Sequence, residues 1–193
     1  MSTAIRVLAF AGSTRADSFN KKLVRLAARG AEEAGAKVTI IDLREFPLPL
    51  YDGDLEAEKG PPEPATMLKR LMVEHDGFLI SCPEYNSSIS AVLKNAIDWA
   101  SRPAAGEAPL VAFKDKVAAL MSASPGALGG LRGLVHVRAI LGNIGVIVLP
   151  GQVAVSKAHE AFNPDGSLKD PKQQAGVHGL GATLASFLAK LKA

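Results

Sequence analysis

The chain has 193 residues, of which 48% are hydrophobic and only 5% aromatic, and these values are typical of one domain with an aliphatic core rather than of a disordered chain. Lysine and arginine outnumber aspartate and glutamate by 22 to 19 without forming a basic block, which disfavours nucleic-acid binding. We therefore expect residues 1–193 to form a single domain.

Strand and helix patterns alternate from the N-terminus. A short apolar run over residues 5–10 predicts a strand, and apolar residues three and four apart over 18–34 predict a helix. Residues 37–43 predict a second strand. Residues 46–64 contain several prolines, which disfavour a regular helix or central strand there. Leu48, Leu50 and Tyr51 make this segment too apolar for a simple linker, so we expect it to pack at a sheet edge or an oligomer interface.

The rest of the chain continues the alternation. The expected elements are a helix over about 67–72, a strand over 78–81, a helix over 89–100, a strand over 116–122, a helix over 131–141, a strand over 146–149 and a last helix over about 180–191. Five strands that alternate with helices predict right-handed crossovers. The expected fold is therefore α/β, a three-layer doubly wound sandwich with a five-stranded parallel sheet. Ligands of such sheets bind at the carboxyl ends of the strands.

The loop after the first strand has the composition of an anion site. This loop brings three hydroxyls, a guanidinium and an amide together ahead of a helix N-terminus, where backbone N–H groups favour a phosphate. The residues are Ser13, Thr14, Ser18, Arg15 and Asn20. The alternative is an ordinary polar turn in which Ser18 caps the helix. The loop lacks both the P-loop pattern and the glycine fingerprint of dinucleotide-binding folds.

The loops after the third and fourth strands also suit a ligand. In the first of them Pro83 rigidifies the strand exit, while Tyr85 offers a flat ring and Asn86 can bond to the edge of a heterocycle. The alternative is local packing of the tyrosine, with one of the following serines, Ser87 or Ser88, as a helix cap. The loop over 122–130 is rich in glycine, which allows close backbone approach to a ligand or forms a flexible turn.

Three segments together resemble the NADPH-dependent FMN reductases, a flavodoxin-like group that includes quinone, azo-dye and chromate reductases. They are Gly-Ser-Thr-Arg-x-x-Ser-x-Asn at 12–20, Pro-Glu-Tyr-Asn-x-Ser at 83–88 and Leu-Lys-Asn-Ala-Ile-Asp-Trp at 93–99. The resemblance implies that FMN is bound by three groups of residues. Ser13, Arg15, Ser18 and Asn20 would hold its phosphate, Pro83, Glu84, Tyr85 and Asn86 would line the isoalloxazine and ribityl chain, and Ser124 and Gly126 would approach the ring. No motif is matched after Gly142.

The resemblance also implies a reaction. NADPH or NADH would pass a hydride to FMN, leave, and be replaced by a small acceptor (a quinone, free flavin, an azo compound or chromate) in ping-pong turnover, with no catalytic side chain. A homodimer or homotetramer is implied too, with residues 48–51 and 89–99 as interface candidates. Arg102 and Arg132 are candidates for contact with the 2′-phosphate of NADPH.

Two other functions stay open from the residues. The first is an FMN-binding electron carrier or redox sensor without NAD(P)H turnover, although such carriers are acidic around the cofactor and this chain is basic. The second is a dinucleotide-binding enzyme in which Asp42 contacts a ribose. No metal site is expected, because the four histidines lack ligand spacing and are expected at the surface or as helix caps.

Nothing in the sequence predicts export or a membrane anchor. The first apolar run, residues 7–11, is too short for a signal peptide, and the longest uncharged stretch, 139–156, is broken by glycines and a proline. The lone Cys82 has no disulfide partner within the chain, which indicates a reducing compartment. We expect a cytoplasmic protein.

Overall fold

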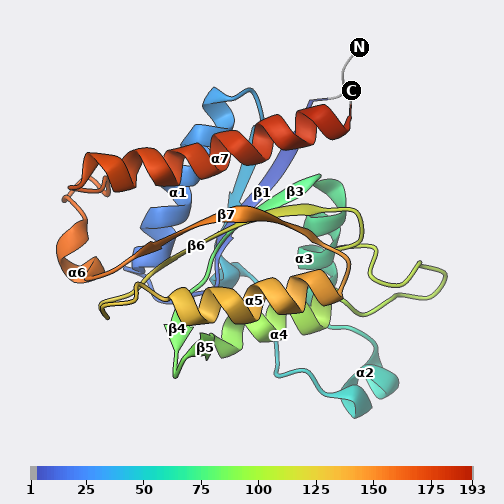
Figure 1. Ribbon diagram of the computed structural model, residues 1–193. Coiled ribbons are helices and arrows are strands. Elements are labelled where there is room, and N and C mark those ends of the chain that lie inside the picture. The colour runs from blue at the N-terminus through green and yellow to red at the C-terminus, as the bar shows by residue number, and fades with distance from the viewer. Residues whose placement is uncertain (1–3, 193) are drawn as a thin grey trace.

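A parallel sheet forms the centre of the computed structural model, which describes residues 4–192 (Figure 1). Its strands are β1 (Arg6–Ala11), β2 (Lys37–Ile41), β3 (Gly77–Ser81), β6 (Val117–Ala123) and β7 (Ile147–Val155). The five strands lie in the order β2-β1-β3-β6-β7, and every neighbouring pair is parallel. The predicted fold class is confirmed.

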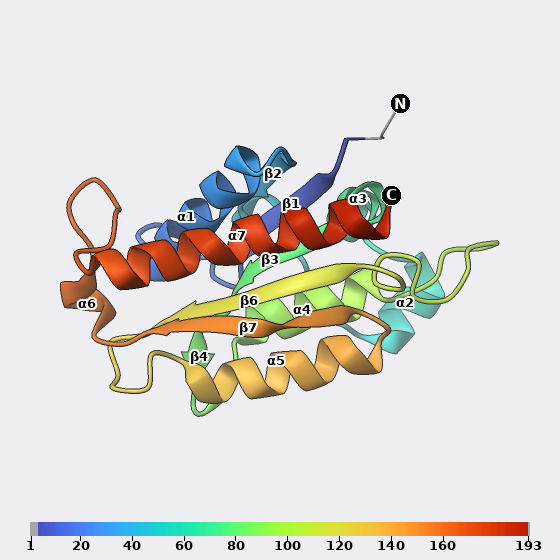
Figure 2. The ribbon, with the colours of Figure 1, turned by 45° about the horizontal axis from the view of Figure 1, so that its top comes forward.

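Helices cover both faces of the sheet (Figure 2). On one face lie α1 (Phe19–Glu33) and α7 (Pro171–Leu191), and on the other lie α3 (Glu63–Glu74), α4 (Ala91–Ala100) and α5 (Leu131–Asn143). Successive residues of β1 alternate between the two cores: Val7 packs in the core with α1 and α7, whereas Leu8 packs in the core with α3, α4 and α5. Both faces are buried, which is why the strands are almost continuously apolar.

Residues 46–64 contain a helix that the sequence analysis did not predict, α2 (Gly53–Lys59). The Asp52 side chain caps it by accepting hydrogen bonds from the N–H groups of Asp54 (2.9 Å) and Leu55 (3.4 Å). Gly60, with a φ of 73°, ends it. The expectation of an irregular segment was wrong here because the prolines flank this helix rather than interrupt it.

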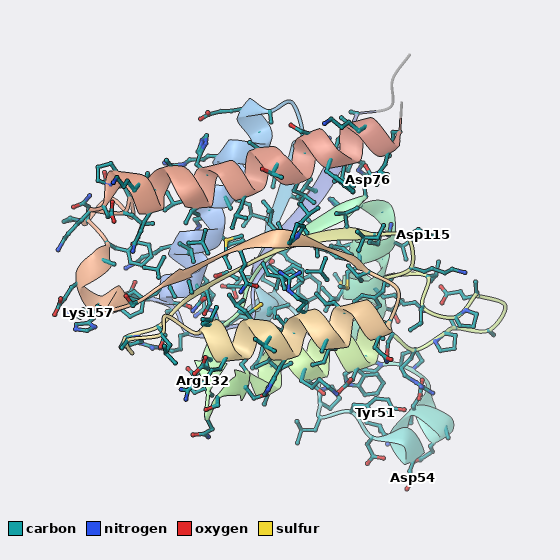
Figure 3. All side chains as sticks on the ribbon, in the orientation of Figure 1. Tyr51, Asp54, Asp76, Asp115, Arg132 and Lys157 are labelled. Atoms are coloured by element: carbon teal, nitrogen blue, oxygen red, sulfur yellow. The ribbon has the colours of Figure 1, made fainter. Side chains whose placement is uncertain are left out.

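The same segment packs on α4, as an edge-packed segment should. Asn95 Nδ2 and Trp99 Nε1 both donate to the Pro49 carbonyl at 2.8 Å. The Tyr51 N–H donates to Asn95 Oδ1 at 2.8 Å, and the Tyr51 ring meets Trp99 edge-on with centroids 5.1 Å apart. Figure 3 shows Tyr51 beside the end of α4 and close to α2. An interface role for this segment stays a prediction.

A small hairpin interrupts the expected connection from β3 to α4. Its strands are β4 (Glu84–Tyr85) and β5 (Ser88–Ile89), paired antiparallel. The two turn residues, Asn86 and Ser87, have φ values of 50° and 66°, as a tight two-residue hairpin turn requires. The predicted helix over 89–100 therefore begins later, at Ala91.

The N-cap of α4 is Ser90, not Ser87 or Ser88. Ser90 Oγ accepts a hydrogen bond from the Leu93 N–H at 3.1 Å and donates one to the Gly12 carbonyl at 2.6 Å. One hydroxyl thus stabilises the helix start and ties it to the loop after β1.

The C-terminal elements are longer than predicted. The last helix, α7, begins at Pro171 rather than near 180, and β7 extends to Val155 rather than 149. The β6–β7 pairing passes an irregularity beside Pro150, where the register moves from Ala118–Val148 to Leu120–Gln152. Two further short elements, η1 (Leu43–Glu45) and α6 (Ala158–Ala161), were not predicted. Among residues 4–192, no helix has the length and hydropathy to cross a bilayer.

Candidate cofactor-binding site

The loops after β1, β3 and β6 meet at the carboxyl edge of the sheet and enclose a cavity of about 180 Å³. Of the ten predicted site residues, the eight that line it are Ser13, Arg15, Ser18, Asn20, Pro83, Glu84, Tyr85 and Ser124. The other two lie close by: Asn86 is in the hairpin turn, and the Gly126 N–H donates to Ser124 Oγ at 3.3 Å. The structure therefore brings together residues from three separate loops, as the sequence analysis predicted.

One end of this cavity is formed by the N-terminus of α1. Lys21 N–H and Lys22 N–H donate to the Ser18 carbonyl at 3.0 and 3.2 Å, whereas the two preceding N–H groups, of Phe19 and Asn20, have no acceptor within residues 4–192. No acidic side chain occupies the first helical turn. Free N–H groups and the helix dipole make this end a suitable anion site.

Two serine hydroxyls at this end are not used by the fold. Ser18 occupies the N-cap position but makes no capping hydrogen bond within the described residues, so the alternative of an ordinary cap is wrong. Ser13 Oγ only accepts a bond, from the Arg15 N–H at 3.3 Å. Both residues are largely buried, at 4% and 7% exposure. Their hydroxyl hydrogens are available to phosphate oxygens.

Arg15 supplies the free positive charge of the loop. Its guanidinium has no ion-pair partner among residues 4–192, whereas Lys22 Nζ lies 2.6 Å from Asp17 Oδ1. The hydrogen bond from Lys22 lowers the pKa of the Asp17 carboxyl. Lys22 and Asp17 thus offset each other, which leaves Arg15 to neutralise an anion.

Lys21, in the first turn of α1, is buried, at 8% exposure. Its Nζ lies 2.6 Å from Asp42 Oδ2 at the end of β2. Burial would raise the pKa of Asp42, but the hydrogen bond from Lys21 and the one from the Arg44 N–H together hold it below its ordinary value. Asp42 is therefore paired within the protein and is not free to bind a ribose.

Asn20 ties the three loops together. Its Oδ1 accepts hydrogen bonds from Ser81 Oγ (2.8 Å) and the Ala123 N–H (3.0 Å), and its Nδ2 donates to the Ala123 carbonyl (2.9 Å). The side chain is 4% exposed. Only one N–H of the amide remains for a ligand, so the geometry gives Asn20 a positioning role in addition to the predicted phosphate contact.

The carboxylate of Glu84 is hydrogen-bonded to the first turn of α5. It accepts hydrogen bonds from Arg132 Nη2 at 2.7 Å, Arg132 Nε at 3.0 Å and the Gly133 N–H at 3.0 Å. Burial would raise the pKa of Glu84, but the bonds from Gly133 and Arg132 outweigh it and lower the pKa. Figure 3 shows Arg132 at the start of α5, beside the hairpin. This Glu84–Arg132 clip, which sequence reasoning did not foresee, joins the β4–β5 hairpin to the first turn of α5.

The hairpin presents the ring of Tyr85, one of the predicted site residues, to solvent. Tyr85 is 54% exposed, and a second cavity of about 310 Å³ lies beside it, lined by residues of the first loop and by the first turn of α4. The two cavities share Ser13, Arg15 and Tyr85. Together they form a groove that leads from the α1 N-terminus past the hairpin.

The cysteine and the histidines are further candidates for reactive or metal-binding groups. Burial raises the pKa of the Cys82 thiol, which is fully buried. Within residues 4–192, no cluster of three histidines, cysteines or acidic residues could hold a metal ion. His75 is the C-cap residue of α3, one of the two expected places for a histidine. It is 2% exposed, and its ring bonds to the Leu71 carbonyl and Thr39 Oγ1.

A doubly wound parallel sheet in the order β2-β1-β3-β6-β7, with three loops enclosing a cavity at its carboxyl edge, has the flavodoxin-like architecture. The model of one family matches residues 5–160. The chain belongs to this family, the NADPH-dependent FMN reductases.

Relatives and solved structures agree with this assignment. The chain is 34% identical to a probable NADPH:quinone oxidoreductase 2 of Oryza sativa subsp. japonica, over 98% of this chain and 91% of that protein. It is 37% identical to an NAD(P)H-dependent FMN reductase of Pseudomonas aeruginosa, over 89% of each. FerB, a flavoenzyme NAD(P)H:(acceptor) oxidoreductase from Paracoccus denitrificans, has a TM-score of 0.81 at 30% identity, covering 97% of this chain and 98% of FerB.

The protein is therefore an oxidoreductase that uses FMN and NAD(P)H. The predicted family, enzyme class and cofactors are confirmed. The assignment favours neither the electron carrier without NAD(P)H turnover nor the enzyme that would bind a ribose through Asp42.

Proposed function

We propose that this protein holds FMN in the groove described above and reduces small acceptors, quinones first among them, with hydride from NADPH or NADH. The phosphate would lie at the α1 N-terminus against Ser13, Arg15 and Ser18, with Asn20 behind it. The ring would lie against Pro83, Glu84, Tyr85 and Asn86, with Ser124 and Gly126 beside it. One observation supports this most: the two unused, nearly buried serine hydroxyls and the unpaired Arg15 face one cavity at a helix N-terminus.

The protein's part in this reaction is to bind and orient. Bound FMN would supply the redox chemistry by accepting a hydride and passing electrons on. The wall of the 180 Å³ cavity contains a single carboxylate, that of Glu84, and this carboxylate is occupied by Arg132 and Gly133. No general acid or base is therefore assigned, and the side chains act through position and charge.

The proposed acceptors follow from the open groove. Because Tyr85 is more than half exposed, a flat acceptor can reach the place that the nicotinamide leaves, which is the physical basis of ping-pong turnover. Relatives bear the names quinone oxidoreductase and quinone reductase, including an Escherichia coli protein 36% identical over 148 residues. Free flavin, azo compounds and chromate are further proposed acceptors.

We propose in addition that residues 1–193 act as one domain in the cytoplasm, as a homodimer or homotetramer. The single cysteine supports a reducing compartment. Leu50, in one of the two predicted interface segments, is 78% exposed and would be buried by a partner copy. Light scattering on a size-exclusion column tests the assembly, and a monomer at micromolar concentration would contradict it.

Initial rates with varied NADPH and varied quinone test the proposed turnover. Parallel double-reciprocal lines are expected, because the two substrates would use one place in turn. Intersecting lines would contradict ping-pong turnover, and an absence of NAD(P)H oxidation with every acceptor would contradict the proposed reductase.

A further inference from the structure

The two arginines predicted to contact the 2′-phosphate of NADPH are both paired within the protein. Arg102 Nε lies 2.9 and 3.0 Å from the two carboxylate oxygens of Glu56, and Arg132 bonds to Glu84. The charge of each guanidinium is thus already offset by a carboxylate of the protein. If the protein recognises the 2′-phosphate, another cation should lie closer to an open cavity.

Such a cavity lies beyond the groove, on the β2 side of the first loop. It measures about 380 Å³, within the range of small-ligand sites. Most of its wall is apolar and comes from the loop after β2 (Leu43, Phe46, Pro47 and Leu48) and from α4 (Val92 and Ala96). Part of this wall belongs to the segments proposed above as an interface, 48–51 and 89–99, so the partner copy in the proposed assembly must leave the mouth of this cavity open. It shares Thr14 and Val92 with the 310 Å³ cavity beside Tyr85, so it continues the proposed FMN groove outward.

Few polar groups of this cavity remain for a ligand. Asn95 lines it, but its Oδ1 accepts from the Tyr51 N–H and its Nδ2 donates to the Pro49 carbonyl. The remaining polar side chains of the wall are those of Thr14 and Arg44. The cavity thus offers an apolar slot with a hydroxyl and one cation.

The positive charge of Arg44 is only weakly offset by a neighbouring carboxylate. Its Nε lies 3.5 Å from Asp42 Oδ2, the same oxygen that Lys21 Nζ approaches to 2.6 Å. Lys21 already offsets the charge of Asp42, and the Arg44 guanidinium donates no hydrogen bond to any residue in 4–192. The side chain is 53% exposed. A planar guanidinium in this state can bind a phosphate through two parallel hydrogen bonds.

We propose that this cavity binds the adenosine 2′-phosphate end of NADPH, with Arg44 as the residue that distinguishes NADPH from NADH. The apolar walls suit the flat adenine ring, and the guanidinium suits the 2′-phosphate, which NADH lacks. The inference rests on the proposed function, because a nicotinamide at the flavin site is what brings the adenosine end into reach.

Binding of adenosine 2′,5′-bisphosphate and of 5′-AMP to the FMN-loaded protein, measured by calorimetry, tests the proposal directly, since these probes differ only by the 2′-phosphate. The wild type should bind the bisphosphate about tenfold or more tightly than 5′-AMP, the ratio expected from charge-assisted hydrogen bonds. Arg44→Ala should remove most of this ratio, and Arg44→Lys should retain part of it. Arg70→Ala is the matched control, because Arg70 is also exposed and also near a carboxylate, Glu74 at 4.0 Å.

Steady-state kinetics give a second readout. Arg44→Ala should lower kcat/KM for NADPH about tenfold while kcat/KM for NADH stays near the wild-type value. Equal binding of the two probes to the wild type, or an unchanged ratio in Arg44→Ala, would overturn the proposal. If NADPH still reduces bound FMN in that case, only the proposed role of Arg44 is wrong and the proposed function stands. If neither NADPH nor NADH reduces bound FMN, the proposed function is wrong. The binding of the two probes then still tests whether the cavity recognises a 2′-phosphate.

Discussion

The residues of the first loop divide into those that hold the fold and those left free for a ligand. Ser13, Ser18 and Arg15 have unused donors at the α1 N-terminus, whereas the Asn20 amide is almost fully bonded to the chain. Sequence reasoning placed all four together correctly. It could not separate their roles, because the partners of Asn20 lie as far as 103 residues away.

Arg15→Ala should weaken FMN binding about tenfold or more, because a charge-assisted hydrogen bond to the phosphate is worth ~1.5–3 kcal/mol. Quenching of FMN fluorescence on titration with apoprotein measures the dissociation constant. Arg70→Ala serves as the control for a general change in charge. A dissociation constant equal to that of the wild type would remove Arg15 from the phosphate site.

Asn20→Ala should destabilise the apoprotein by about 1–3 kcal/mol, because it leaves the Ala123 N–H and carbonyl and the Ser81 hydroxyl without their buried partner. Urea unfolding in the absence of FMN measures this loss. A variant with wild-type stability but weak FMN affinity would show that Asn20 acts only as a ligand and not as the tie between the loops.

At the scale of elements, the helices and strands that could be predicted are those marked by residues close together in the sequence, such as caps and turn residues. The α2 helix was missed because its prolines lie outside it, and its Asp52 cap and Gly60 end are ordinary signals once those prolines are set aside. The β4–β5 hairpin was missed because its Asn86-Ser87 turn lacks the glycine usual at such turns. The Glu84–Arg132 clip joins residues 48 positions apart, and no local pattern marks it.

Glu84→Gln should lower stability at pH 7 by about 1–2 kcal/mol, because the amide can still bond to the Gly133 N–H but loses the charge-assisted bonds to Arg132. The lowered pKa of Glu84 fixes the sign of the pH dependence. Its contribution is fully present above the unfolded-state value of 4.5 and is lost as pH falls through the folded-state pKa.

Urea unfolding of wild type and Glu84→Gln between pH 7 and pH 3 measures this difference. The two free energies of unfolding should converge as the pH falls below about 4.5. Glu160→Gln, at an exposed carboxylate beside His159, is the matched control. A constant difference at every pH would show that the clip does not depend on the charge of Glu84.

At the scale of the whole molecule, the alternation of apolar runs and amphipathic stretches was sufficient to predict a parallel five-stranded sheet and the edge that carries the site. It was not sufficient for the packing of the layers. The α1–α7 contact depends on Gly30 and Gly181, whose hydrogens face backbone of the opposite helix, and a sequence pattern does not show which glycines meet.

Gly181→Ala should destabilise the protein by about 1–3 kcal/mol, because its Cβ would lie 1.8 Å from the Ala27 carbonyl oxygen and force α1 and α7 apart. Gly179→Ala, in the same helix with nothing within 4 Å of its added Cβ, should be neutral or stabilising. Thermal unfolding of both variants measures the contrast. Equal melting temperatures would mean that the two helices are not packed as closely as the structure shows.

The proposed function of the whole molecule depends on FMN bound at the carboxyl edge and reduced there by a nicotinamide. The most direct measurement is the visible absorption spectrum of the purified protein loaded with FMN, recorded anaerobically before and after addition of NADPH. We predict flavin bands that are retained through gel filtration and that bleach on addition of NADPH. Bands lost on gel filtration would contradict the proposed site, and retained bands that bleach with neither NADPH nor NADH would contradict the proposed reductase.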